Sequence, residues 1–110
     1  MINKAILIGR LGNRPEMRVY ENGRKVAWFS LATSEYYRDK EGKIQEQTEW
    51  HKITCYGPLA DFVYETLTKG KLVFVEGKIH YYQAKNQNYT EIVAQKIRIL
   101  GKRKVKKTPE

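Results

Sequence analysis

The sequence predicts an all-β fold in which five strands close into a small barrel, with one helix between the third and fourth strands. Five segments are rich in β-branched, aliphatic or aromatic residues, and turn-forming residues separate them. A single segment, which follows Gly57-Pro58, has the apolar spacing of a helix. The chain has 110 residues, which indicates one domain with a modest hydrophobic core.

The first strand is predicted over residues 4–11, where aliphatic and β-branched residues are dense. Ile6 and Ile8 fall on one face, while Ala5, Leu7 and Leu11 fall on the other. Because a barrel strand buries only its inner face, a second apolar face requires a cover. We expect a partner subunit to supply it, with Ile6 and Ile8 at the contact.

The second and third strands are predicted from the turn signals around them. Residues 17–20 are extended, and Asn22-Gly23 then predicts a hairpin, because Asn-Gly accepts the positive φ angles of a tight turn. The second strand is predicted over residues 25–35 and the third over residues 48–56. The charged residues 38–43 between them predict a mobile loop.

A helix of about three turns is predicted after Pro58, a residue that suits the first helical position. Lys69 is expected in its last turn, and Gly70 is expected to cap its C-terminus. The apolar residues at helical spacing are Leu59, Phe62, Val63 and Leu67. The helix is therefore expected to plug the barrel between the third and fourth strands.

The last two strands are predicted over residues 72–82 and 89–100, with a polar hairpin tip at residues 84–88. Five strands with a helix between the third and fourth are typical of the OB-fold, a Greek-key barrel. We therefore expect an OB-fold domain at residues 1–100. Residues 101–110 are expected to form a basic, disordered tail.

Twenty-one Lys and Arg against twelve Asp and Glu give a formal net charge of +9 and a pI near 9.7. Such an excess favours a polyanionic partner, with nucleic acid first and an anionic membrane surface second. The predicted helix carries Asp61 and Glu65 on its polar face, so it is not a basic membrane anchor. Solvated lysines without a partner remain an alternative explanation of the charge.

The third strand carries the most informative pattern. Alternation places Trp50, Lys52, Thr54 and Tyr56 on one face and His51, Ile53 and Cys55 on the other. The Ile53 and Cys55 positions resemble core. An aromatic and basic row instead favours single-stranded nucleic acid, because rings stack on bases and lysine meets phosphate. Packing of Trp50 and Tyr56 against residues 37–46, or against another subunit, remains open.

Further aromatic residues cluster at the predicted loops. Tyr36 and Tyr37 precede Arg38 at the end of the second strand, and Tyr81, Tyr82 and Tyr89 flank the last hairpin. With their basic neighbours, we interpret them as additional stacking groups. Trp28 has the opposite parity to Phe29, a core candidate, so it either helps binding or covers a subunit contact.

No enzyme, metal or cofactor is expected. Cys55 is the single cysteine, so it makes no intramolecular disulfide or structural zinc site, and the acidic residues are scattered. His51 has no nearby catalytic partner in the sequence. The N-terminal apolar run is too short for a membrane span and resembles no signal peptide, which predicts a reducing, cytoplasmic setting.

Motifs along residues 2–100 closely resemble those of the bacterial-type single-stranded DNA-binding proteins. They include Asn3 to Gly12, Leu31 to Glu35, Gln47 to His51, Tyr56 to Ala60 and Val75 to Ile79. The resemblance implies an OB-fold homotetramer that wraps single-stranded DNA in replication, recombination and repair, near the nucleoid. A dimeric replication-restart accessory protein and an RNA-binding OB module are the rival hypotheses.

By position, the resemblance implies roles for individual residues. Tyr37, Trp50 and Tyr56 match stacking aromatics, and Lys52, Arg18 and Lys69 match basic positions near the DNA path. His51 matches a position at subunit contacts, although an ordinary strand histidine fits equally well.

The sequence departs from the family pattern in three places. The aromatic of the last hairpin falls on Ala84, and Tyr82, two residues earlier on the same face, is the expected substitute. Pro58 replaces an often basic residue. The chain closes in a basic tail instead of an acidic tip, so recruitment of partner enzymes through such a tip is not expected.

Overall fold

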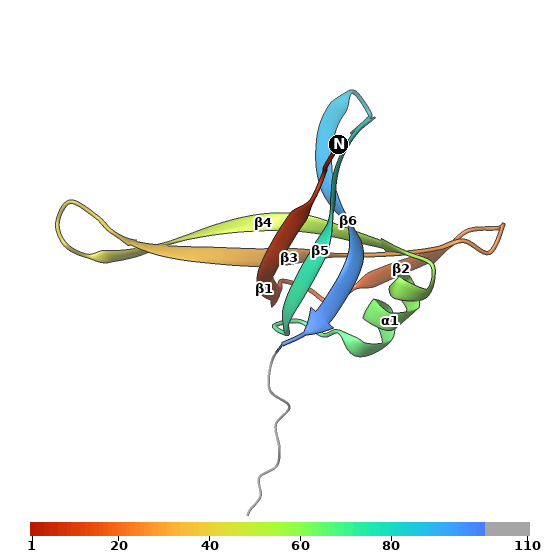
Figure 1. The fold of residues 1–110 in the computed structure, drawn as a ribbon, viewed down its shortest axis with the longest axis horizontal. Coiled ribbons are helices and arrows are strands. Elements are labelled where there is room, and N and C mark those ends of the chain that lie inside the picture. The colour runs from red at the N-terminus through yellow and green to blue at the C-terminus, as the bar shows by residue number, and fades with distance from the viewer. Residues whose placement is uncertain (101–110) are drawn as a thin grey trace, which may run out of the picture.

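The fold of residues 1–100 is described by a computed structural model. Its elements are β1 (Ala5–Leu11), β2 (Glu16–Val19), β3 (Lys25–Arg38), β4 (Ile44–Tyr56), α1 (Pro58–Thr66), β5 (Leu72–Ala84) and β6 (Gln87–Ile99). The strands form one sheet in the order β1-β5-β6-β4-β3-β2, and β1 also pairs with β3. Figure 1 shows the resulting closed barrel, with α1 packed against one end.

Two short pairings close the barrel. β1 meets β3 through Arg10 opposite Ala32 and Leu11 opposite Leu31. β4 meets β6 in parallel at Ile53 opposite Ile92 and Thr54 opposite Val93. All the pairings other than that of β4 with β6 are antiparallel. This closed sheet with a helix between β4 and β5 confirms the OB-fold prediction, and β2 is the extended segment expected at residues 17–20.

The core lies inside the barrel and under α1. Phe29, Leu31 and Ile53 are at most 1% exposed, and Val63 of α1 is fully buried beside them. Burial of such side chains contributes about 1.5–3 kcal/mol each to folding. The predicted inward positions of Phe29, Ile53 and Cys55 are confirmed.

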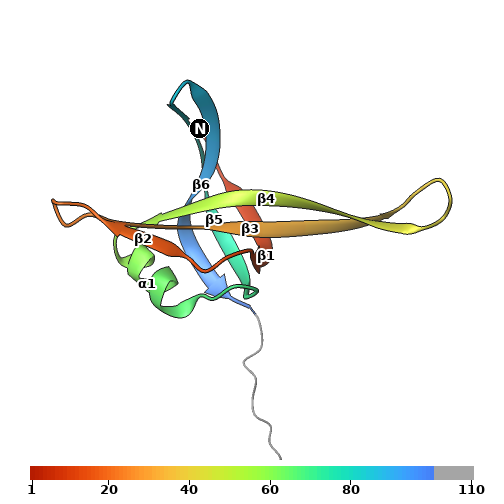
Figure 2. The ribbon, with the colours of Figure 1, turned by 180° about the vertical axis from the view of Figure 1, so that it is seen from behind.

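Three hairpins project from the barrel, as the front and back views show (Figures 1 and 2). They join β2 to β3, β3 to β4 and β5 to β6. The first turn contains Gly23 with φ 85°, in agreement with the predicted Asn-Gly hairpin. The last turn is tighter than predicted, because only Lys85 and Asn86 lie outside the strands and both have positive φ.

The β3–β4 hairpin is longer and its turn shorter than the sequence predicted. Both strands continue to Arg38 opposite Ile44, so the turn is residues 39–43. Asp39 organises it by accepting hydrogen bonds from the Gln45 side chain and from the backbone N–H groups of Glu41 and Lys43, each 2.9 Å long. These bonds hold the pKa of Asp39 below its usual value, and the bond from Gln45 has the largest effect.

The predicted end of the helix was wrong. α1 ends at Thr66, and Leu67 is already extended with ψ 143°. Leu67 is nevertheless only 2% exposed, so the apolar pattern of the sequence continues past the end of the helix. Lys69 and Gly70 therefore belong to the α1–β5 connection, where the Gly70 N–H donates to the carbonyl of Leu11. Among residues 1–100, no helix is long and apolar enough to cross a membrane.

Candidate nucleic-acid interface

The outer side of β3 and β4 carries a continuous row of aromatic and basic side chains. Residues directly opposite on antiparallel strands share a face, and the register pairs Val26 with Tyr56, Trp28 with Thr54 and Ala32 with Trp50. Lys52 lies between them, opposite Ser30. Trp28 is therefore on the same face as Lys52 and Tyr56.

Trp50 is held by a close approach to the chain after β1. A Cβ on Gly12 would lie 2.3 Å from Cζ3 of Trp50, so any larger residue would displace the indole from this position. The Gly12 N–H donates to the Ser30 carbonyl at 2.9 Å, and Ser30 N–H and hydroxyl both donate to Asn13 Oδ1. The six-membered ring of Trp50 thus lies close to the Gly12 backbone, while Trp50 remains 61% exposed.

A hollow of about 440 Å³ lies beside this row, between β4 and the β5–β6 hairpin. Its lining residues are Tyr20, Val26, Trp28, Lys52, Thr54, Tyr56, His80, Tyr82 and Glu91. Lys52 Nζ donates to the Tyr82 hydroxyl at 3.0 Å and lies 5.5 Å from that ring centroid. Four residues predicted to bind nucleic acid therefore meet here: Trp28, Lys52, Tyr56 and Tyr82.

The floor of the hollow holds a buried carboxylate. Glu91, 6% exposed, accepts a 2.6 Å hydrogen bond from the Thr54 hydroxyl, and its other oxygen lies 2.9 Å from Nδ1 of His80. Thr54 was placed by alternation on the open row, but it is only 4% exposed because Glu91 covers it. Both carboxylate oxygens have partners, as a buried charge requires.

Three rings form a stack along the β5–β6 hairpin. His80 stacks on Tyr82 with centroids 5.8 Å apart, and Tyr82 stacks on Tyr89 at 5.3 Å, with interplanar angles of 17° and 20°. Tyr82 is the central ring of this stack and directly borders the hollow. Ala84 lies farther out, opposite Gln87 and next to the turn.

The other predicted binding residues lie apart from this hollow. Tyr37 is opposite Gln45 far along the β3–β4 hairpin, and its register puts it on the other face of the ribbon from Trp50. Arg38 donates to the Gly42 carbonyl at 2.9 Å within the turn. Arg18 lies on β2 opposite Val26, with its guanidinium 5.6 Å from the Tyr20 ring. Lys69 is exposed on the α1–β5 connection.

The three residues predicted at subunit contacts occupy two places. Ile6 and Ile8 point outward from β1 and are 57% and 54% exposed, large values for isoleucine. His51 faces the opposite side of β4 from Trp50 and is half-buried, with Nε2 2.9 Å from the Thr33 hydroxyl. Ile6 and Ile8 thus leave an apolar surface open in the single chain.

Cys55 is sealed inside the barrel. Burial raises the pKa of its thiol to about 12, so the reactive thiolate does not form near neutral pH. Within residues 1–100, no three His, Cys, Asp or Glu side chains gather as a metal site would require.

The Single-strand binding protein family model matches residues 2–100, nearly the whole described chain. The chain belongs to this family. A single-stranded DNA-binding protein of Neisseria meningitidis serogroup B is 47% identical over 107 residues. Single-stranded DNA-binding protein 1 of Chlorobaculum tepidum is 42% identical over 106 residues.

The chain spans about three fifths of the length of these curated relatives. The alignments cover 93% and 91% of this chain but 62% and 65% of the two relatives. Among solved structures, a Plasmodium falciparum SSB complex with single-stranded DNA superposes with a TM-score of 0.80 at 34% identity, covering 92% of this chain and 96% of that chain. The wild-type Thermus aquaticus protein gives 0.78 at 30% identity, covering 93% and 52%.

Proposed function

We propose that this protein binds single-stranded DNA without sequence specificity and protects it during replication, recombination and repair in the cytoplasm, near the nucleoid. The observation that carries the proposal is the row of Trp28, Lys52 and Tyr56 beside an open hollow, with Trp50 farther along it. Family membership supports the same conclusion, since the family consists of binding proteins and not of enzymes. The related Plasmodium structure is a complex with single-stranded DNA.

In this proposal, aromatic rings stack on the bases and basic side chains contact the phosphates. Trp50 and Tyr56 offer ring faces to bases, and each stack contributes about 1–3 kcal/mol whatever the base. Tyr82, which already stacks on His80 and Tyr89, borders the path at the hollow. Lys52 and Arg18 neutralise phosphates between the stacks, so affinity falls as salt rises. The Glu91 carboxylate at the floor of the hollow takes no part in these contacts, because Thr54 and His80 already satisfy its oxygens.

Tyr37 and Arg38 extend the proposed path along the β3–β4 hairpin, and Lys69 adds a phosphate contact from the α1–β5 connection. Tyr37 is 52% exposed and Arg38 is exposed, so both are accessible to a strand that crosses the ribbon. A flexible single strand can pass from the Trp50 face to the Tyr37 face around the ribbon edge, which a rigid duplex cannot do.

The proposed assembly is a homotetramer, with β1 at the contact. The outward Ile6 and Ile8 side chains support this, because burying them against another subunit removes apolar surface from water. His51 is proposed to stand at a further subunit contact. Native mass spectrometry of the free and DNA-bound protein tests the assembly: a tetramer is expected, and a monomer at micromolar concentration would exclude it.

Competition binding tests the function. A labelled oligothymidylate is bound to the protein and displaced by unlabelled DNA, RNA or duplex DNA of equal length. Single-stranded DNA is expected to compete best, because unpaired bases reach the rings and paired bases do not. A clear preference for RNA would replace this proposal with an RNA-binding function.

A further inference from the structure

The hairpin between β2 and β3 carries a second aromatic and basic pair, Tyr20 and Arg24, which the sequence patterns did not single out. The Tyr20 N–H donates to the Arg24 carbonyl, and the Gly23 N–H donates to the Tyr20 carbonyl, each at 2.8 Å. The Arg24 N–H donates to Asn22 Oδ1 at 2.9 Å. The backbone of this turn therefore fixes where both side chains begin.

Both side chains point to the face that carries the row on β4. Arg18 lies opposite Val26, and Val26 lies opposite Tyr56, so these three share a face. Tyr20 lies two positions after Arg18, and Arg24 lies two positions before Val26. Alternation therefore places Tyr20 and Arg24 on the same face.

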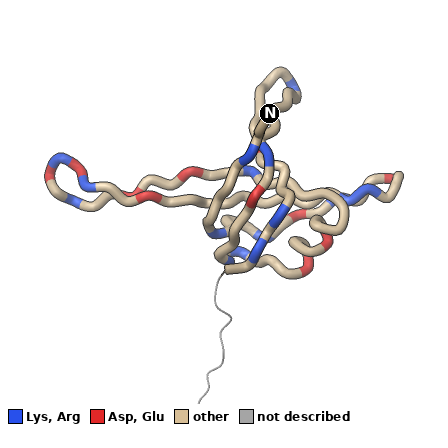
Figure 3. The backbone as a smooth tube through the Cα atoms, viewed as in Figure 1, with Lys and Arg blue, Asp and Glu red and all other residues tan. Residues whose placement is uncertain are grey.

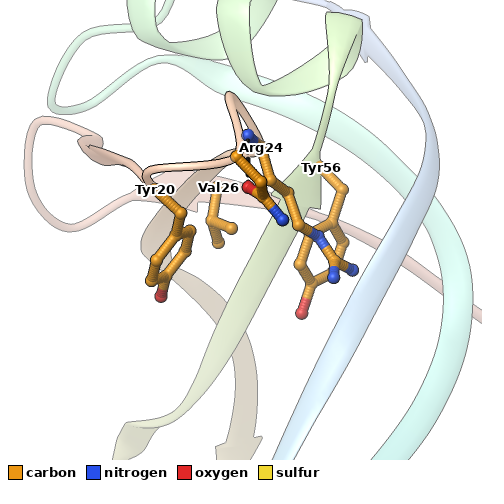
Figure 4. Close-up of a pocket in the computed structure, with 5 residues that line it drawn as sticks. Tyr20, Arg24, Val26 and Tyr56 are labelled. Atoms are coloured by element: carbon orange, nitrogen blue, oxygen red, sulfur yellow. Dashed lines mark hydrogen bonds between the residues drawn. The ribbon is translucent and has the colours of Figure 1, made fainter.

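A hollow of about 380 Å³ lies between these side chains, lined by Tyr20, Asn22, Arg24, Val26 and Tyr56. Figure 4 shows the Tyr20 and Tyr56 rings on either side, Val26 between them and the Arg24 guanidinium beside Tyr56. Three of its lining residues, Tyr20, Val26 and Tyr56, also line the hollow beside Lys52. The two hollows therefore form one continuous path.

We propose that this hollow is an additional nucleotide subsite, in which a base stacks on Tyr20 and Arg24 binds the adjoining phosphate. The inference rests on the proposed binding of single-stranded DNA and extends its path onto the β2–β3 hairpin. Tyr20 is 45% exposed, so its ring is accessible to a base. The basic residues near the tip of this hairpin, visible in Figure 3, supply charge for the phosphate chain.

Arg24 also controls access to Tyr56. In the free protein its guanidinium lies 5.0 Å from the Tyr56 ring centroid, where a base would otherwise stack. A base stack contributes more than an exposed cation–π contact, so an incoming base displaces the guanidinium. Arg24 then turns toward the phosphate, and one residue serves as a cover in the free protein and as a contact in the complex.

Substitution of Tyr20 by Ala tests the stack. Binding of oligothymidylates is measured across about 4–16 nucleotides, the range of site sizes for one OB-fold. The variant is expected to bind the longer strands about 5- to 150-fold more weakly, the loss that one base stack predicts, and Tyr20→Phe is expected to restore affinity. The shortest strands, which fit within the Lys52 hollow, are expected to lose less.

Tyr64 on α1 offers a matched control. It is 41% exposed and has Arg14 5.8 Å from its ring, much as Tyr20 has Arg18 at 5.6 Å, but it lines neither hollow. Tyr64→Ala is therefore expected to leave affinity unchanged. Circular dichroism confirms that each variant is folded.

Arg24→Ala tests the phosphate contact against Arg14→Ala, which removes the same charge elsewhere. The slope of log affinity against log salt is expected to fall in magnitude by about 0.7 for Arg24→Ala, the share of one phosphate on a single strand. Arg14→Ala is expected to leave the slope unchanged. Equal slopes in both variants would show that Arg24 acts only through net charge, and would overturn its role.

The inference and the proposed function fail in different ways. If the folded Tyr20→Ala variant binds every strand length as tightly as the wild-type protein does, the subsite is overturned. The proposed function still stands in that case, because the wild-type protein binds single-stranded DNA. Absence of single-stranded DNA binding by the wild-type protein would overturn both.

Discussion

Replacing Trp50 with Ala is expected to weaken single-stranded DNA binding by about 1–3 kcal/mol, with almost no loss of folding stability. The expectation follows from how Trp50 is placed. Trp50 is 61% exposed and its six-membered ring lies close to Gly12, so it contributes little to the core while its position is restricted and much of the indole is accessible. A fixed ring also loses less side-chain entropy on binding than a free one. Titration with an oligothymidylate and chemical denaturation measure the two quantities.

Trp50→Phe is the matched variant, because it retains a stacking ring of smaller area. It is expected to lose only part of the affinity lost by Trp50→Ala. Wild-type affinity in folded Trp50→Ala would mean that Trp50 serves another purpose, such as a contact between subunits.

Replacing Gly9 with Val is expected to destabilise the fold by about 3 kcal/mol, the upper end of the usual overpacking range. A Cβ at Gly9 would lie 2.1 Å from the Ala32 carbonyl oxygen and 3.0 Å from its carbon. These are backbone atoms of β3, beside the two residue pairs that join β1 to β3. The strands must separate to make room, and the barrel opens at its closure. Urea denaturation measures the loss.

Ser34→Val is the control for this substitution. It places the same β-branched side chain on an exposed position of β3, where a strand tolerates it. Little change in stability is expected. A Gly9→Val protein as stable as the Ser34→Val protein would show that the β1–β3 contact yields without cost and does not hold the barrel closed.

Local patterns in the sequence were sufficient to predict the order of the strands along the chain, the start of the helix and the aromatic and basic row on β4. Each depends on neighbours along the chain: alternation separates Trp50 from His51, and Pro58 begins α1 where its missing N–H is not needed. The helix end was misplaced because Leu67 fits the apolar spacing of α1 but lies beyond its end. Leu67 is apolar because it is buried in the core. Apolar spacing alone does not separate these two causes.

Long-range pairings produced the features that the sequence did not predict. Thr54 is covered because β6 runs parallel to β4 and brings Glu91 over it, 37 residues away in the chain. Tyr20 and Arg24 join the binding face only through the β2–β3 and β3–β4 registers, which connect them to Tyr56. The room for Trp50 depends on Gly12 from another part of the barrel. No window of the sequence contains such pairs together.

Tryptophan fluorescence tests the central claim most directly, with Trp28→Phe leaving Trp50 as the sole tryptophan. Titration of this variant with an oligothymidylate is expected to quench the emission to saturation, because a base stacks on the exposed indole, and added salt is expected to reverse it. Tight binding without any change in Trp50 emission would contradict the account, since the strand would then bind elsewhere on the protein.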